Sequence, residues 1–244
     1  MRAIVTGING TVAPVLAKSL RNAGHIVIPW NRNDVPTDNP SAVNDFISSE
    51  KPDWFFHLAT GSPLWAELIA RNCNLNKVKL LFTSSVSVFS GTQKGPFTIE
   101  SIPQPVQEYG RYKLECEKKV REANSAALIT RLGWQIGEVP GGNHLLDYLE
   151  NTFKTEGKIE ASINWFQSCS FIDDTAESLI NLMEMESAGL YHLDGNPGIN
   201  FYEIAISLNR LVNNRWLVIQ GEIPDQNNLL IDERIRVRAI TERF

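Results

Sequence analysis

The chain has 244 residues, which is enough for one large domain or for a core domain with a smaller lobe. Its hydrophobic content of 43% and its charged content of 21% are those of an ordinary globular protein. The net charge of −5 argues against a nucleic-acid partner, because binding to phosphates requires a basic face. No apolar run approaches the ~20 residues of a membrane span, and the first residues do not resemble a signal peptide. We therefore expect a cytoplasmic protein with no membrane partner.

The cysteines and histidines are scattered and form no metal-binding motif. The three cysteines, Cys73, Cys116 and Cys169, are odd in number, and no pair of them has the spacing of metal ligands. This usage is typical of a reducing compartment. Among the four histidines, His25 and His57 are expected to lie in strands. No metal site is predicted.

Short apolar runs alternate with segments of helical spacing over roughly the first 135 residues. The predicted strands cover residues 2–6, 25–30, 53–59, 78–85 and 126–133. The predicted helices cover residues 12–22, 42–51, 64–73 and 112–123. Strands that alternate with helices indicate a parallel sheet with helices on both faces. The predicted fold class is therefore α/β with a doubly wound parallel sheet.

The pattern changes after Gly137, and the back third is expected to form a smaller lobe. Helices are predicted over residues 144–154, within 170–186 and over 200–212, and a short strand over 189–193. The charged end of the chain, residues 231–244, is compatible with an edge strand or with a docking tail. The sequence leaves both possibilities open.

The first predicted strand runs into a glycine-rich turn with the pattern G-x-x-G-x-x-A, from Gly7 to Ala13. The first glycine permits a tight turn, and Gly10 lets the backbone approach a pyrophosphate. A small residue at Ala13 lets the following helix pack close to the sheet, with its N-terminus facing the phosphates. A plain strand-to-helix turn is the alternative. The pattern predicts a Rossmann-type dinucleotide site with Gly7, Asn9, Gly10, Thr11 and Val12 as cofactor-binding residues.

The end of the second strand indicates which dinucleotide is bound. NAD sites usually place a carboxylate there for the ribose 2′-hydroxyl, but the chain reads Trp30-Asn31-Arg32-Asn33 and has no carboxylate before Asp34. The planar guanidinium of Arg32 is suited to pair with a 2′-phosphate. NADP(H) is therefore favoured, with NAD(H) left possible. The alternative is an arginine that is simply exposed after a strand.

Tyr109 and Lys113 are spaced i and i+4, which places them on one face of a helix. Tyr112 points roughly 100° away from Lys113. A phenol with a pKa near ~10 is a poor acid at neutral pH, and a nearby ammonium is expected to lower that pKa. Gly110 costs about 1 kcal/mol in a helix interior, but it permits the close approach of a ligand or of backbone. Two ordinary helix residues are the alternative.

A cluster of hydroxyl groups follows the predicted strand at residues 78–85. Its members are Thr83, Ser84, Ser85 and Ser87. Ligands of open parallel sheets bind beyond the carboxyl ends of the strands. A serine there could donate to a substrate carbonyl oxygen while Tyr109 delivers a proton. Capping of the backbone by these hydroxyls is the alternative.

Taken together, these motifs resemble the extended short-chain dehydrogenase/reductase family. T-G-x-x-G-x-x-A, FFHLA, LLFTSSVSVF and YGRYK occur in the order of that family. RLGWQIG, CSFIDDTAESL and GLYHLDG are similar to segments of dTDP-4-dehydrorhamnose reductases and of NAD-dependent epimerase/dehydratase proteins. The resemblance implies a Rossmann domain at residues 1–137 and a mostly substrate-binding lobe at residues 138–244, of which 168–193 can pack back on the first domain.

The resemblance also implies an activity and the roles of several residues. The expected enzyme reduces a nucleotide-linked 4-keto sugar with NADPH, with Tyr109 as the proton donor, Ser85 holding the oxygen and Lys113 binding the ribose. Ala59, Asn31 and Tyr109 are also expected to contact the cofactor. The resemblance places Trp134 and Asn143 at the substrate, with buried packing of Trp134 and a turn role for Asn143 as the alternatives.

Other functions on this scaffold stay open to different degrees. Val86 and Ser87 stand where dehydratases of this type carry an Asp-Glu pair, which argues against dehydration. An epimerase that keeps NAD bound is a second possibility. The connection from Ala59 to Val78 is shorter than is usual in the family. The short connection puts in doubt a homodimer formed through a helix in this segment. It also leaves a non-catalytic, dinucleotide-binding regulatory protein as a third possibility.

Overall fold

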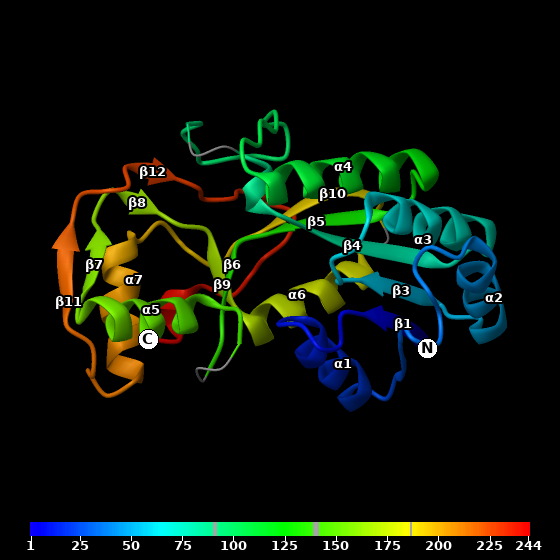
Figure 1. The fold of residues 1–244 in the computed structure, drawn as a ribbon, viewed down its shortest axis with the longest axis horizontal. Helices are drawn as coiled ribbons and strands as arrows, with labels where there is room; N and C mark the ends of the chain where they lie inside the picture. The colour runs from blue at the N-terminus through cyan, green and yellow to red at the C-terminus, as the bar shows by residue number, and fades with distance from the viewer. Residues whose placement is uncertain (90–91, 139–141, 186) are drawn as a thin grey trace.

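The first lobe of the computed structural model is built on one six-stranded parallel sheet, with the strand order β10-β5-β4-β3-β1-β2 (Figure 1). The structure describes residues 1–89, 92–138, 142–185 and 187–244. The strands are β1 (Arg2–Thr6), β2 (Ile26–Pro29), β3 (Trp54–His57), β4 (Lys79–Ser85), β5 (Leu128–Leu132) and β10 (Gly189–Leu193). Every residue of β3 and β5 is buried, as expected for strands covered on both faces. The predicted α/β class with a doubly wound sheet is confirmed.

Helices cover both faces of this sheet, and the covering apolar side chains form two separate clusters. One face carries α2 (Pro40–Glu50), α3 (Pro63–Leu75) and α4 (Glu108–Ala123), and the other carries α1 (Ala13–Asn22) and α6 (Ile172–Glu184). Figure 1 shows α3 and α4 on one side of the strands and α1 and α6 on the other. The short connection after Ala59 contains the complete helix α3, which packs along α4. The crossover from β3 to β4 is therefore intact.

The ends of these elements follow local chemistry. Asn39 begins α2 by accepting a hydrogen bond from the N–H of Ala42 at 3.1 Å, and Ser62 begins α3 by accepting from Trp65 at 3.1 Å. The strand predicted at residues 25–30 is observed only over Ile26–Pro29, so the expectation that His25 lies in a strand is wrong. His25 follows the positive-φ Gly24, where the chain is still leaving α1. His57 lies in β3 as predicted.

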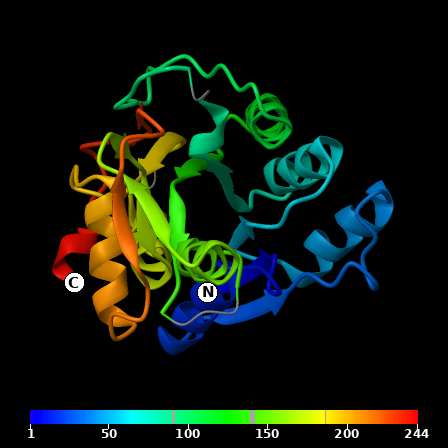
Figure 2. The same ribbon diagram turned by 60° about the vertical axis from the view of Figure 1, so that its left-hand side comes forward.

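The second lobe is assembled from three short strand pairs and two helices around its own apolar core. Its elements are β6 (Trp134–Ile136), α5 (Leu145–Glu156), β7 (Ile159–Ser162), β8 (Trp165–Phe166), β9 (Cys169–Phe171), α7 (Phe201–Leu211), β11 (Val218–Gly221) and β12 (Gln226–Asn227). Figure 2 shows α7 and β11 standing apart from the blue and cyan elements of the first lobe. Between β9 and α7 the chain returns to the first lobe as α6 and β10. Residue 186, the end of the predicted helical segment, lies outside the described residues.

The charged C-terminal segment is a docking tail, and its last described element is the 3-10 turn η2 (Ile240–Glu242). Ile235 and Val237 pack against the core of the first lobe, whereas Ile240 is buried in the core of the second. Arg243 pairs with Asp173 and Asp174 at the start of α6, at 2.8 and 3.1 Å. The tail therefore bridges the two lobes. In the part of the chain that the structure describes, no helix is long and apolar enough to cross a membrane.

Gly110 lets helix α4 approach the 3-10 turn η1 (Val86–Val88) that follows β4. A Cβ atom at Gly110 would lie 2.0 Å from the carbonyl oxygen of Ser87 and 2.9 Å from the ring of Pro105. The expectation that this glycine permits a close backbone approach is therefore confirmed. The contact presses the first turn of α4 against the end of β4.

We predict that Gly110→Ala lowers the free energy of unfolding by about 1–3 kcal/mol, although Ala is usually better than Gly inside a helix. The added methyl group meets a backbone oxygen that cannot rotate away. Urea unfolding measures the change. Gly24→Ala is the matched control, because nothing lies within 4 Å of a Cβ there and only its φ of +80° resists the substitution. A Gly110→Ala variant as stable as the natural chain would contradict the prediction.

Candidate active site

A cleft of about 1630 Å³ opens between the two lobes at the carboxyl ends of the sheet strands. The glycine turn, the end of β2 and the start of α4 line one side, and β6, β8 and the β12 segment line the other. All the predicted site residues lie along this cleft. They are Gly7, Asn9, Gly10, Thr11, Val12, Asn31, Arg32, Ala59, Ser85, Tyr109, Lys113, Trp134 and Asn143.

The glycine turn has the geometry of a phosphate-binding loop. Gly7 has a φ of +82°, and a Cβ there would lie 3.0 Å from the backbone nitrogen of Ala59. The N–H of Gly10 closes the turn by donating to the carbonyl of Gly7 at 2.7 Å. No side chain caps the N-terminus of α1, and no acidic residue occupies its first turn. The N–H groups and the positive end of the helix dipole therefore face the cleft, as a pyrophosphate requires.

The hydroxyl of Thr6 fixes the ends of β1 and β3 beneath this turn. Its Oγ1 accepts hydrogen bonds from the N–H groups of Leu58 and Ala59, both at 3.0 Å, and lies 2.9 Å from Nδ1 of His57. With both acceptor positions used, the hydroxyl donates to Nδ1, which therefore carries no proton. Burial, followed by the charges of Lys113 and Arg32, lowers the pKa of His57 to about 3. Sequence reasoning missed this neutral histidine, whose partner is known only from the strand register.

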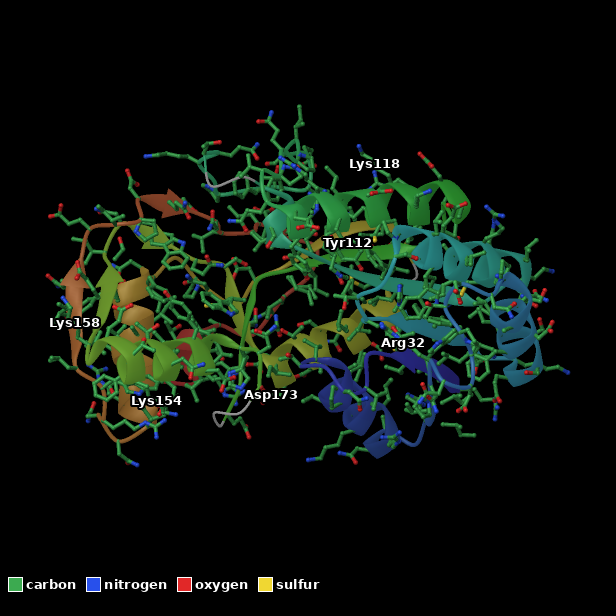
Figure 3. All side chains as sticks on the ribbon, in the orientation of Figure 1. Arg32, Tyr112, Lys118, Lys154, Lys158 and Asp173 are labelled. Carbon is green, nitrogen blue, oxygen red and sulfur yellow. The ribbon has the colours of Figure 1, made fainter. Side chains whose placement is uncertain are left out.

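Arg32, which is labelled in Figure 3, lines the cleft beside the end of β2. Its Nη2 donates to the carbonyl of Thr60, and its guanidinium carbon lies 5.0 Å from the ring of Trp65. Asn31 does not extend toward Arg32 but donates to the carboxylate of Asp34 at 2.6 Å. The first carboxylate after the strand is thus already bonded, and Arg32 is the cation at this end of the cleft. Sequence reasoning missed Trp65, because its helix is remote from Arg32 in the sequence.

Lys113 points from α4 into the interior, and its side chain is almost fully buried. Its Nζ donates to the carbonyl of Thr83 at 2.9 Å and lies 5.9 Å from the ring centre of Tyr109. Burial lowers the pKa of Lys113 to about 8. The ammonium is therefore close to its titration point at neutral pH.

Tyr109 lines the cleft, but its pKa moves in the opposite direction from the one expected. Tyr109 is 46% exposed, and the burial of the rest of its side chain raises its pKa above the usual value of a phenol. The expectation that Lys113 lowers this pKa is wrong, because desolvation dominates and the ammonium, 5.9 Å from the ring centre, is bonded to the Thr83 carbonyl. The phenol is therefore neutral at pH 7 and carries the hydrogen that a proton donor needs.

Tyr112, labelled in Figure 3, does not lie away from Lys113 as expected, because Nζ of Lys113 is 5.7 Å from the centre of the Tyr112 ring. Its hydroxyl accepts from the N–H of Gly61 at 3.0 Å. Burial raises the pKa of Tyr112 to about 12. Tyr112 is thus a structural neighbour of the site, and it provides a control for Tyr109.

Ser85 lies at the carboxyl end of β4 and both caps the backbone and lines the cleft. Its Oγ accepts from the N–H of Ser87 at 3.1 Å and donates to the Oγ of Ser87 at 3.1 Å. The Ser85 hydroxyl can rotate away from Ser87 and donate to a ligand instead. Because Ser87 is only partly buried, the loss of this hydrogen bond leaves no buried polar atom without a partner. The Thr83 hydroxyl donates instead to the carbonyl oxygen of His57, at 3.5 Å.

The second lobe supplies an aromatic and amide wall opposite Tyr109. The ring of Trp134 lies 5.0 Å from that of Tyr148 and 6.4 Å from that of Trp165. Asn143 lies at the mouth of the cleft, where its carbonyl accepts from Thr11 at 3.4 Å. Sequence reasoning missed several residues of this wall, which come from separate segments with no shared motif: Gln135, Trp165, Gln167, Gln226 and Asn228. Among the described residues no cluster of potential metal ligands is found.

Comparisons with known proteins agree with this architecture. Residues 64–221, more than half of the chain, match the family described as RmlD substrate binding domain. A dTDP-4-dehydrorhamnose reductase of Burkholderia thailandensis is 30% identical over 251 residues, which cover 92% of this chain and 81% of that protein. The methionine adenosyltransferase 2 subunit beta of Xenopus tropicalis is 25% identical over 237 residues, which cover 85% of this chain and 71% of that protein.

A solved structure shares the fold across both lobes. The dTDP-4-dehydrorhamnose reductase of Bacillus anthracis, in complex with NADP, superimposes with a TM-score of 0.82 at 20% identity, over 95% of this chain and 90% of that one. The glycine turn, the Tyr109–Lys113 pair and the second lobe lie in one cleft of this fold. The chain therefore belongs to the RmlD family of extended short-chain dehydrogenases/reductases, which are NAD(P)-dependent oxidoreductases.

Proposed function

We propose that the protein is an NADP-dependent reductase of a nucleotide-linked 4-keto sugar. The observation that carries the proposal is one cleft lined by the glycine turn, by Ser85 and by the Tyr109–Lys113 pair. The printed names of relatives such as the Burkholderia thailandensis reductase support a sugar-nucleotide substrate. The NADP bound to the Bacillus anthracis protein supports the cofactor.

The residues of the cleft fit a nicotinamide dinucleotide phosphate. Gly7 and Gly10 leave a space beside α1 that side chains would fill, and the uncapped N–H groups of that helix suit the pyrophosphate. Arg32, stacked on Trp65, would pair with the 2′-phosphate through its free nitrogens. Lys113 would bind ribose hydroxyls. When bound, the reduced cofactor supplies the hydride.

The side chains of this chain supply the proton and the electrostatic support. As negative charge develops on the substrate oxygen, Tyr109 donates its phenolic hydrogen to that atom, and Ser85 turns its hydroxyl from Ser87 to the same oxygen. Two donors already aimed at a developing charge lower the barrier because they need no reorganisation during the reaction. The raised pKa of Tyr109 keeps the phenol protonated until that moment.

A second candidate, a regulatory subunit that binds a dinucleotide without turning over a substrate, is favoured by one observation. The Xenopus tropicalis relative is named as a subunit of another enzyme and is matched over 85% of this chain. Under this hypothesis the protein binds NADPH but shows no turnover with any keto sugar. Steady-state assays with a panel of nucleotide-linked 4-keto sugars distinguish the two candidates.

We predict that Tyr109→Phe lowers kcat by about 10²- to 10⁴-fold, the usual contribution of a general acid. The Kd for NADPH, measured by fluorescence titration, should change only a few-fold, because the aromatic ring that lines the cleft remains. Tyr112→Phe is the matched control on the same helix and should retain most of the activity. Full activity of Tyr109→Phe would exclude Tyr109 as the donor.

We predict that Arg32→Gln weakens NADPH binding by about 10- to 100-fold, which corresponds to losing one or two charge-assisted hydrogen bonds. Binding of NADH should change little, because NADH has no 2′-phosphate. Isothermal titration with both cofactors measures the selectivity directly. An equal loss for both cofactors would show that Arg32 acts through the local fold around Trp65 and not through the phosphate.

We predict that the affinity for NADPH falls as the pH rises through about 8, where Lys113 loses its charge. The attraction between the ammonium and the anionic cofactor is complete below this pH and absent above it, so the Kd should rise by up to about tenfold per pH unit. Lys113→Met should remove this pH dependence of the Kd. Lys119→Met, on the same helix but paired with Glu67, should keep it. A pH-independent Kd in the natural chain would contradict the assignment.

A further inference from the structure

A buried ion pair joins helix α4 to strand β5 behind the cleft. The Nε of Arg131 donates to Oε1 of Glu117 at 2.9 Å, and its Nη2 donates to Oε2 at 2.8 Å. Both side chains are 3% exposed. Replacing such a pair with apolar side chains of similar volume is often neutral or stabilising, because desolvation offsets the attraction. Stability alone is therefore a weak explanation for this pair.

The pair continues into a histidine on strand β10. The Nη1 of Arg131 lies 3.4 Å from Nε2 of His192, and Nδ1 of His192 lies 3.1 Å from the carbonyl oxygen of Phe97. A carbonyl only accepts, so Nδ1 carries the hydrogen and Nε2 accepts from Arg131. Burial, followed by the charge of Arg131, lowers the pKa of His192 to about 4, so the ring is neutral at pH 7.

Phe97, at one end of this network, lies directly behind a wall of the cleft. Its N–H donates to Leu229 at 2.7 Å, and its carbonyl accepts from Ile231 at 2.8 Å. Its ring stacks on Phe89 at 4.0 Å, and the guanidinium of Arg131 lies 5.1 Å from the Phe89 ring. Phe89 lines the cleft directly, as does Asn228 beside Leu229. The segments that meet at Phe97 thus form a surface of the substrate space.

Glu117, at the other end, lies on the helix that carries the proposed proton donor. Tyr109, Lys113 and Glu117 follow one another at spacings of four residues, which places all three along one face of α4. Glu117 lies one turn beyond Lys113, and both side chains are buried. A shift of Glu117 along Arg131 would therefore move the donor and its lysine together.

We propose that Arg131 and His192 are positioning residues, which hold the Tyr109 helix in register with the wall formed around Phe89 and Phe97. This inference rests on the proposed reductase function. The network joins α4, β5, β10 and the two loop segments at Phe97, and a displacement of about 1 Å between a donor and its substrate can reduce the rate 100-fold. In this proposal the ion pair fixes geometry and contributes little to stability.

The double variant Glu117→Leu/Arg131→Met tests the ion pair. The apolar pair fills a similar space, so the thermal midpoint and the Kd for NADPH should stay close to those of the natural chain. The kcat should fall by about 10- to 100-fold. Glu67→Gln/Lys119→Met is the matched control, because that ion pair also anchors α4, at 2.9 Å, but to α3. A folded Glu117→Leu/Arg131→Met variant with natural kcat, or an equal loss of kcat in the control, would overturn the proposal.

Two variants of His192 test the far end without removing the ion pair. The side-chain oxygen of Gln can take the place of Nε2 and accept from Arg131, but this variant loses the bond to Phe97, whereas the side-chain nitrogen of Asn can take the place of Nδ1 and donate to Phe97. We expect His192→Gln to lower kcat more than His192→Asn, with NADPH affinity unchanged in both. Equal kcat values for both variants and the natural chain would contradict the role of the Phe97 bond.

Hydrogen exchange of the NADPH-bound protein gives a readout that does not depend on turnover. If the network couples its two ends, His192→Gln should speed exchange in the first turn of α4, at residues 109–113, as well as at residues 93–98. Faster exchange at 93–98 alone would overturn the coupling. If the natural chain binds NADPH but turns over no keto sugar, the proposed function fails, while the exchange result still decides the coupling.

Discussion

The close approach of backbone to backbone at two glycines is the constraint on which the cleft depends. Gly7 brings the first turn against the end of β3 at Ala59, and Gly110 brings helix α4 against the turn after β4 at Ser87. One contact sets where phosphates can meet the N-terminus of α1. The other sets how far Tyr109 stands from the hydroxyls at the end of β4. A side chain at either position would separate the two halves of the site.

Burial then decides the charge of the groups that these contacts bring together. His57 and His192 are both kept neutral, by desolvation and by neighbouring cations. Lys113 is brought near its titration point, and Tyr109 is held as a neutral phenol. The site at rest therefore holds a proton on the phenol and few fixed charges. Under the proposed function, such a site favours the transfer of a proton to an oxygen that becomes negative only during the reaction.

The second lobe is tied to the first by chain segments that cross between them. The chain leaves through β6, returns through α6 and β10, and crosses again in the C-terminal tail, where Arg243 reaches Asp173 and Asp174. The buried network through Arg131 and His192 adds a polar link to the wall at Phe97. The membership in the RmlD family accounts for this two-lobed fold.

The sequence by itself determined the alternation of strands and helices, the glycine turn and the spacing of Tyr109 and Lys113. These depend on interactions between neighbours in the chain, and apolar periodicity and glycine placement report such interactions directly. The tertiary structure alone decided that Lys113 bonds to Thr83, that Arg32 rests on Trp65 and that Arg131 joins Glu117 to His192. These partners are separated by 14 to 61 residues in the sequence, and only the folded sheet brings them into contact. The direction of the Tyr109 pKa was wrong at the sequence level for the same reason, because the burial that raises it comes from packing between distant segments.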